Sequence, residues 1–256
     1  MSTQDRLYYV FGIGGHALEH LPENVGQIIE NGLSIFYQPV AYEEFNEQAL
    51  KAHLEDPKWV TRQAVAHQQK VQAIFERSPA LVPFRFGTIF ENEASLKDVL
   101  LEKQQEWKEK LATLEGKAEW DLKAFEQEDE LEAAVLAQNS ELKQSKEAIA
   151  AATPGRAFLL KRQWAHQWQN AVSQHHQWFI QEVARHANTW PFSLVWKNKS
   201  SGTDQQAPEA VWQMALLGPR EPFDTFRPKI LPLLQELPEQ GYKFSINGPW
   251  PAYHFT

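Results

Sequence analysis

The sequence predicts an α+β protein of two domains, residues 1–116 and 117–256, the second of them ferredoxin-like. Short segments in both halves alternate apolar with polar residues, which is typical of strands. Longer segments between them carry apolar residues at helical spacing. The second half follows the order strand, helix, strand, strand, helix, strand. This βαββαβ order is that of an antiparallel sheet covered on one face by two helices.

The first domain is predicted to contain three strands and three helices. Leu7–Ile13 is apolar on both faces, so we expect it to be a central strand. Asp56–Pro57 separates two of the helices, and Gly116 ends the third. The remaining expected elements are strands at Leu33–Val40 and Ala80–Phe90 and helices at Glu43–Glu55, Trp59–Arg77 and Ala94–Leu114.

The second domain is predicted to carry an inserted long helical hairpin, about 126–187. Its arms are expected at Glu126–Ala152 and from Arg156 to about His186, with a turn at Thr153–Gly155. Each arm would be roughly 40 Å long at 1.5 Å per residue. The distal part could project as a coiled hairpin or fold over the first domain. The other expected elements are strands at Glu119–Phe125, Phe192–Trp196, Val211–Leu217 and from Tyr242, and a helix at Pro222–Leu237.

Composition excludes several classes of function. The chain of 256 residues has a net charge of −8 and no cysteine, so disulfides, cysteine zinc sites and thiol catalysis are excluded. No apolar run approaches the about 18 residues of a membrane span, and no signal peptide is apparent. The basic residues are scattered and outnumbered, which disfavours nucleic acid binding. We therefore expect a cytoplasmic protein.

The central block Leu81–Phe90 combines residues that disturb a strand. Pro83 cannot donate to a ladder, which favours an edge position or a bulge, and Gly87 indicates a bend. Arg85 lies between Phe84 and Phe86. Burying it would require a carboxylate partner. We expect Arg85 to be buried or half-buried in a structural ion pair.

The C-terminal segment continues a strand pattern into Gly248-Pro249-Trp250-Pro251-Ala252-Tyr253-His254-Phe255. Chain ends are usually frayed and polar. Three aromatic residues so close to the end therefore indicate a docked segment. We expect it to pack on its own protein; a tail reserved for a partner is the alternative.

Four blocks together resemble the gas vesicle GvpL/GvpF family. They are Leu7–Phe11, Leu81–Phe90, Gly155–Leu159 and Gly248–Phe255, and their order and spacing cover nearly the whole chain. The motif residues, which are also possible interaction residues, are Pro83, Phe84, Arg85, Phe86, Gly87, Gly155, Arg156, Gly248, Pro249, Trp250, Pro251, Tyr253 and Phe255.

The resemblance implies a non-enzymatic accessory protein or minor component, without cofactors, associated with gas vesicles. Such proteins bind the small hydrophobic shell protein, alongside other accessory vesicle proteins, and limit its aggregation during nucleation and assembly. A structural part of the shell is an alternative. The resemblance also implies two α+β domains, the second ferredoxin-like.

An enzymatic alternative rests on the turn Gly12–Gly15, which loosely fits a dinucleotide fingerprint. The required helix is not expected, because His16–Ile29 contains Pro22, Asn24 and Gly26. The histidines form no recognisable metal motif. No serine or lysine has an activating base nearby in the sequence. We therefore expect no catalytic site and no metal site.

Overall fold

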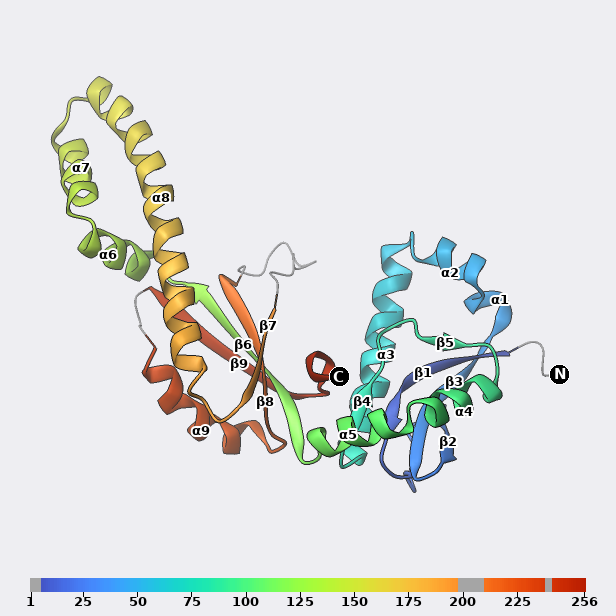
Figure 1. Cartoon of the computed structure of the whole chain (residues 1–256). Helices are drawn as coiled ribbons and strands as arrows, with labels where there is room; N and C mark the ends of the chain where they lie inside the picture. Colours follow the sequence, from blue (N-terminus) through green and yellow to red (C-terminus); the bar gives the residue numbers. More distant parts are fainter. Residues whose placement is uncertain (1–5, 198–209, 238–240) are drawn as a thin grey trace. The chain divides into compact units, whose positions relative to one another are not determined.

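The computed structural model describes residues 6–197, 210–237 and 241–256, which form two compact units (Figure 1). Of these described residues, unit 1 comprises 6–119, 217–220 and 249–256, and unit 2 comprises 120–197, 210–216, 221–237 and 241–248. This division differs from the predicted ranges, because residues 117–119, 217–220 and the last eight residues, Pro249–Thr256, cluster with the N-terminal unit.

Unit 1 is built on an antiparallel sheet of five strands, ordered β2-β3-β1-β4, with β5 also pairing with β1. Its strands are β1 (Arg6–Gly14), β2 (Gly26–Glu30), β3 (Leu33–Ala41), β4 (Leu81–Pro83) and β5 (Ile89–Phe90). The predicted central position of the first strand is confirmed. Strand β2 was missed, since its five residues have no clear alternation.

Helices cover both faces of this sheet. Val10 and Ile13 of β1 pack in a core with Leu96, Leu100 and Trp107 of the last two helices. The alternate β1 side chains, such as those of Tyr9 and Phe11, pack in a second core with the first three helices. The helices are α1 (Tyr42–Phe45), α2 (Glu47–His53), α3 (Pro57–Arg77), α4 (Glu93–Glu102) and α5 (Gln104–Leu114).

The predicted strand Ala80–Phe90 is wrong, because the chain turns between β4 and β5. Both the N–H and the hydroxyl of Thr88 donate to the carbonyl oxygen of Arg85, at 3.3 and 2.8 Å. Gly87 has φ of +83°, a left-handed conformation that side chains disfavour. The two short strands therefore pair with successive parts of β1, Gly12–Gly14 and Tyr8–Tyr9.

Three predicted helices are each broken into two, two of the breaks lying at an asparagine. The side chain of Asn46 accepts from the N–H of Ala49 at 2.9 Å, and that of Asn139 accepts from Leu142 at 3.1 Å. Each asparagine thereby satisfies an unpaired N–H at the start of a new helix. The third break lies at Lys103, whose φ and ψ of −116° and 24° are not helical.

Unit 2 contains a four-stranded sheet of order β7-β8-β6-β9. The ends of β6, β8 and β9 belong to unit 1. The elements are β6 (Lys117–Glu126), α6 (Glu128–Gln138), α7 (Ser140–Ala151), α8 (Pro154–Ala187), β7 (Ser193–Lys197), β8 (Trp212–Pro219), α9 (Phe223–Gln235) and β9 (Tyr242–Trp250), followed by the short η2 (Tyr253–Phe255).

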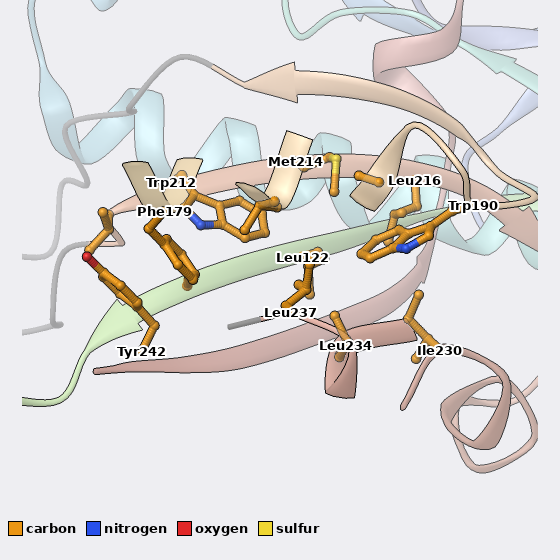
Figure 2. Close-up of a cluster of buried hydrophobic side chains, with 14 of the residues drawn as sticks. Leu122, Phe179, Trp190, Trp212, Met214, Leu216, Ile230, Leu234, Leu237 and Tyr242 are labelled. Carbon is orange, nitrogen blue, oxygen red and sulfur yellow. The ribbon is translucent and has the colours of Figure 1, made fainter. Parts of the chain in front are cut away.

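One face of this sheet carries the core of unit 2, and both α8 and α9 pack on it (Figure 2). The ring of Phe179 in α8 stacks on Tyr242 of β9, with centroids 3.7 Å apart. Trp120 of β6 stacks on Phe226 of α9 at 4.1 Å. The alternating apolar residues of the strands thus bury one face beneath two helices, which leaves the rest of α8 beyond the sheet.

The predicted hairpin is present, with α6 and α7 together packing along α8. Helix α8 has 34 residues, about 50 Å at 1.5 Å per residue. Its first half and α7 extend beyond the sheet of unit 2 (Figure 1). In the residues that the structure describes, no helix combines the length and apolarity needed to cross a membrane.

Candidate functional site

The central block and the C-terminal tail meet at His67 of α3, within unit 1. The side chain of His67 is only 4% exposed. Its Nδ1 lies 3.0 Å from the hydroxyl of Tyr9, and its Nε2 lies 3.1 Å from the carbonyl oxygen of Phe84 and 3.4 Å from the hydroxyl of Tyr253. One imidazole therefore joins β1, the central block and the tail.

The direction of these hydrogen bonds follows from their chemistry. A carbonyl oxygen only accepts, so Nε2 of His67 carries the proton and donates to Phe84. Nδ1 then accepts from the hydroxyl of Tyr9, whose oxygen accepts from the N–H of Gly87 at 3.0 Å. With both ring nitrogens engaged, His67 holds the central block rather than offering a free base.

Burial keeps this group of side chains neutral. Desolvation lowers the pKa of His67 to about 4, although the hydrogen bond to Phe84 opposes the shift. Desolvation also raises the pKa of Tyr9 to about 12 and that of Tyr253 above its usual value. A neutral imidazole between two neutral phenols therefore holds these segments together through hydrogen bonds.

The tail is anchored a second time, at Glu119 of β6. Glu119 is 4% exposed. One of its carboxylate oxygens accepts from the N–H of His254 at 3.0 Å, and the other lies 2.7 Å from Nδ1 of the same residue. Pro251 and Ala252 are buried, and Tyr253 and Phe255 pack against the two cores of unit 1. The prediction that the tail packs on its own protein is confirmed for these residues, whereas Trp250 is 42% exposed.

The prediction for Arg85 is wrong. Arg85 is exposed, and no carboxylate oxygen of the described residues lies within the 4.0 Å of an ion pair. The chain does not continue as a strand through Phe84–Phe86. The turn before Thr88 carries Arg85 to the surface, while Phe86 packs against the aromatic core.

The Gly12–Gly15 segment has a packing role. Gly12 and Gly14 lie inside β1. A Cβ at Gly12 would lie 2.5 Å from the carbonyl oxygen of Val82, so glycine permits the close pairing of β1 with β4. No helix follows in Gly15–Val25, all of which the structure describes. The segment therefore lacks the helix N-terminus on which a dinucleotide fingerprint depends.

A pocket of about 350 Å³ opens beside His67. Tyr9, Phe11 and Phe45 line it, together with Glu44 and Lys70. Among the described residues, no cluster of three or more histidines and acidic side chains could hold a metal ion. The pocket offers aromatic surface without a nucleophile paired with a base.

The start of α8 presents a surface of different character. Gly155 and Arg156 are exposed, as are the next large apolar residues, Phe158 and Leu159, each at 69%. No heavy atom lies within 4 Å of a Cβ built at Gly155, apart from its chain neighbours and the backbone of its own helix. On the opposite side of the helix, Nε1 of Trp164 donates to the carbonyl oxygen of Leu142 at 3.3 Å. One side of α8 therefore packs on α7 and the other is open.

The family model described as "Gas vesicle synthesis protein GvpL/GvpF" matches residues 7–256. The chain belongs to the GvpL/GvpF family. It is 29% identical over 259 residues to gas vesicle protein F of Streptomyces sp. (strain CB03234), covering 97% of this chain and 98% of the relative. It is 25% identical over 272 residues to gas vesicle protein L of the same strain, covering 100% of this chain and 94% of the relative.

The fold of this GvpL/GvpF chain is also that of solved GvpF structures. GvpF from Microcystis aeruginosa aligns with a TM-score of 0.60 at 20% identity, over 97% of this chain and 98% of that one. GvpF from Anabaena sp. PCC7120 aligns with a TM-score of 0.62 at 17% identity, over 98% of both chains. The mixed α/β fold with two sheets is thus shared along the full length.

In this GvpL/GvpF chain, the residues that join the motif blocks were largely missed in the sequence. His67 lies on the apolar stripe of its helix, which was a usable signal of burial. Glu119 and Asp121 alternate with the apolar Trp120 and Leu122, a pattern that indicates an exposed position, yet Glu119 is buried. Nothing local marks it, because its partner His254 is 135 positions away.

Proposed function

We propose that this chain is a non-enzymatic accessory protein or minor component of gas vesicles that binds the hydrophobic shell protein. Binding would limit aggregation of the shell protein during nucleation and assembly, in concert with other gas vesicle proteins. Membership of the GvpL/GvpF family supports a role in gas vesicle formation. The names of both relatives, gas vesicle proteins F and L, agree with it.

The observation that carries the proposal is the exposed pair Phe158 and Leu159. At 69% they are the two most exposed large apolar side chains among the described residues. They are adjacent in sequence, whereas the other exposed large apolar residues occur singly. Exposed apolar surface in contiguous form is typical of interaction sites. An aggregation-prone subunit could cover its own apolar surface there.

We also propose that unit 2 is a ferredoxin-like domain carrying this hairpin. The element order along the chain and the sheet order β7-β8-β6-β9 support it. The domain ranges 1–116 and 117–256 remain our proposal for how the chain is organised, with the tail Pro249–Thr256 returning to the first unit. The hairpin then occupies the place of the first helix of the domain.

The test is suppression of shell protein aggregation by the full chain. Shell protein diluted from denaturant should scatter less light when the wild-type chain is present. The double variant Phe158→Ala/Leu159→Ala should lose this effect while melting at the wild-type temperature. A matched control, Leu54→Ala/Val65→Ala, removes two exposed apolar side chains from unit 1, of 58% and 51% exposure. It should retain the effect.

Two results would contradict the proposal. If the wild-type chain does not reduce light scattering, the proposed accessory role is wrong. If the Phe158→Ala/Leu159→Ala variant suppresses aggregation as well as the wild type, the hairpin is not the binding surface. Retention of the chain in quantity by washed vesicles would favour a structural component over a transient accessory factor.

A further inference from the structure

The exposed pair Phe158 and Leu159 lies in a basic region of an acidic protein. The whole chain has a net charge of −8, yet the 34 residues from Ala148 to Gln181 contain no aspartate or glutamate. Three permanent cations, Arg156, Lys161 and Arg162, fall within this stretch and close to the pair. All three are exposed. The local charge is therefore opposite in sign to that of the protein as a whole.

Helix geometry places the cations on both sides of the apolar pair. At about 100° per residue, Phe158, Leu159 and Arg162 share the side of α8 that faces away from α7. Lys161 flanks this face beside Phe158, and Arg156 flanks it beside Leu159. The surface therefore has an apolar centre with cationic edges. We call it the basic face; it consists of Arg156, Phe158, Leu159, Lys161 and Arg162.

These cations are not neutralised within the hairpin. Across the described part of the chain, none of the three has a carboxylate oxygen within the 4.0 Å of an ion pair. The carboxylates of the neighbouring α7, Glu141 and Glu147, are exposed and also lie beyond this distance from the three cations. Of the other hairpin carboxylates, Glu132 of α6 pairs with Lys146 of α7, and Glu182, farther along α8, pairs with Arg185 at 2.6 Å. Exposed cations around exposed apolar side chains favour a ligand that supplies both carboxylates and apolar surface.

We propose that the basic face docks an acidic amphipathic helix of a partner protein. This deepens the proposed function and rests on it where the partner is the shell protein. A helix is the fitting occupant because the surface of α8 offers side chains and no free backbone edge, and helices pack by interdigitating side chains. Apolar residues of the partner cover Phe158 and Leu159, and its flanking glutamates or aspartates meet the cations on either side.

An anionic membrane fits the same surface less well. Interfacial helices bury a continuous apolar face, whereas the wide apolar stripe of α8 is the one that packs on α7, and only two large apolar side chains face outward. An extended anionic surface would also repel the remainder of a chain whose net charge is −8. A short acidic helix contacts the basic face alone and avoids that repulsion.

The experiment measures binding of the full chain to a defined probe. The probe is a labelled synthetic helix of about 18 residues, long enough to be helical, with leucines on one stripe flanked by glutamates. A counterpart has lysines in place of the glutamates. Fluorescence anisotropy at about 50 mM and about 500 mM salt separates screened from unscreened contacts. Anionic lipid vesicles form a third arm, and the shell protein a fourth.

The wild type should bind the glutamate helix and not the lysine helix, with affinity falling at high salt. Arg156→Glu/Arg162→Glu should weaken this binding by about tenfold or more at low salt, since each reversal replaces an attraction with a repulsion. The control Lys58→Glu/Arg62→Glu makes the same charge change at exposed positions of α3. It should bind as the wild type does.

Each other outcome has a definite meaning. Equal binding of both synthetic helices, equal loss in the control variant, or binding of vesicles in preference to the glutamate helix would overturn the proposal. If the shell protein binds the wild type and Arg156→Glu/Arg162→Glu equally well, the basic face is wrong and the proposed function survives. If the glutamate helix binds and the shell protein does not, the proposed function fails and the basic face stands.

Discussion

Acidification should destabilise unit 1 through His67, and the structure gives the size of the effect. The imidazole is 4% exposed and its pKa is lowered from 6.5 to about 4 by desolvation. In the unfolded chain the ring takes up a proton near pH 6.5, whereas in the folded chain it resists until about pH 4. The unfolded state therefore binds more protons between these values, so stability falls as the pH falls through this window.

The magnitude follows from the two pKa values. The full shift, from 6.5 to about 4, corresponds to about 3 kcal/mol at 1.36 kcal/mol per unit. At pH 5 the loss of stability already amounts to about 2 kcal/mol, and at pH 7.5 almost no stability is lost. The two tyrosines that contact His67 stay protonated throughout, because burial raises their pKa values. The imidazole is thus the group in this contact that titrates.

The variant His67→Gln isolates the contribution of this ring. Glutamine stays neutral at every pH, and its amide can still donate to the carbonyl oxygen of Phe84. The measurement is urea unfolding at pH 7.5 and at pH 5. Hydrogen exchange of the β1 amides serves as the readout, because it reports the stability of unit 1. The carboxylates common to both chains cancel in the comparison. The wild type should lose about 2 kcal/mol more than the variant over this interval.

A matched control is His16→Gln, which removes an exposed histidine of the same unit. It should follow the wild type at both pH values. If the wild type and His67→Gln lose the same stability on acidification, the imidazole is not held neutral by the fold. The directions assigned to the hydrogen bonds of Tyr9 and Phe84 would then be wrong as well.

Three further perturbations test the packing. Deleting Pro249–Thr256 should lower the free energy of unfolding of unit 1 in urea by about 3 kcal/mol or more, because buried apolar groups and the hydrogen-bond donors to Glu119 are lost. An unchanged unfolding transition would show that the tail is dispensable for stability. Gly241→Ala should lower the free energy of unfolding by more than about 2 kcal/mol, measured by thermal unfolding. The reason is that φ at Gly241 is +87° and the new Cβ would lie 2.4 Å from the backbone of α6. The control Gly155→Ala places its Cβ in open space and should not destabilise the protein. Arg85→Ala should change the free energy of unfolding by less than about 0.5 kcal/mol. A decrease of several kcal/mol in this free energy would indicate that Arg85 forms an ion pair.

Regular elements could be predicted because their signals are local. The alternation in Tyr242–Ile246 and the helical stripe through Val71 and Ile74 reflect how side chains project from strands and helices. The breaks at Asn46 and Asn139 were missed because an asparagine inside an apolar pattern looks like any polar position. Its capping role depends on a contact with the backbone three residues ahead, which the pattern does not record.

The site could not be predicted for a different reason. The contacts that define it join residues far apart in sequence: Tyr9 and His67 are 58 positions apart, and Glu119 and His254 are 135 apart. The sequence correctly indicated that the central block and the tail are unusual. It did not indicate that both are held by one histidine, and the assumption of a continuous strand placed Arg85 on the wrong side of the backbone.

This arrangement changes how mutations in the motif blocks should be interpreted. Tyr253 packs against the second core of unit 1 and lies near His67, so its loss would impair vesicle formation through instability. Trp250 belongs to the same motif but is 42% exposed. A Tyr253→Ala chain that melts early and makes no vesicles reports folding. A Trp250→Ala chain that melts normally and makes no vesicles would report a contact, and would add the start of the tail to the hairpin as a binding surface.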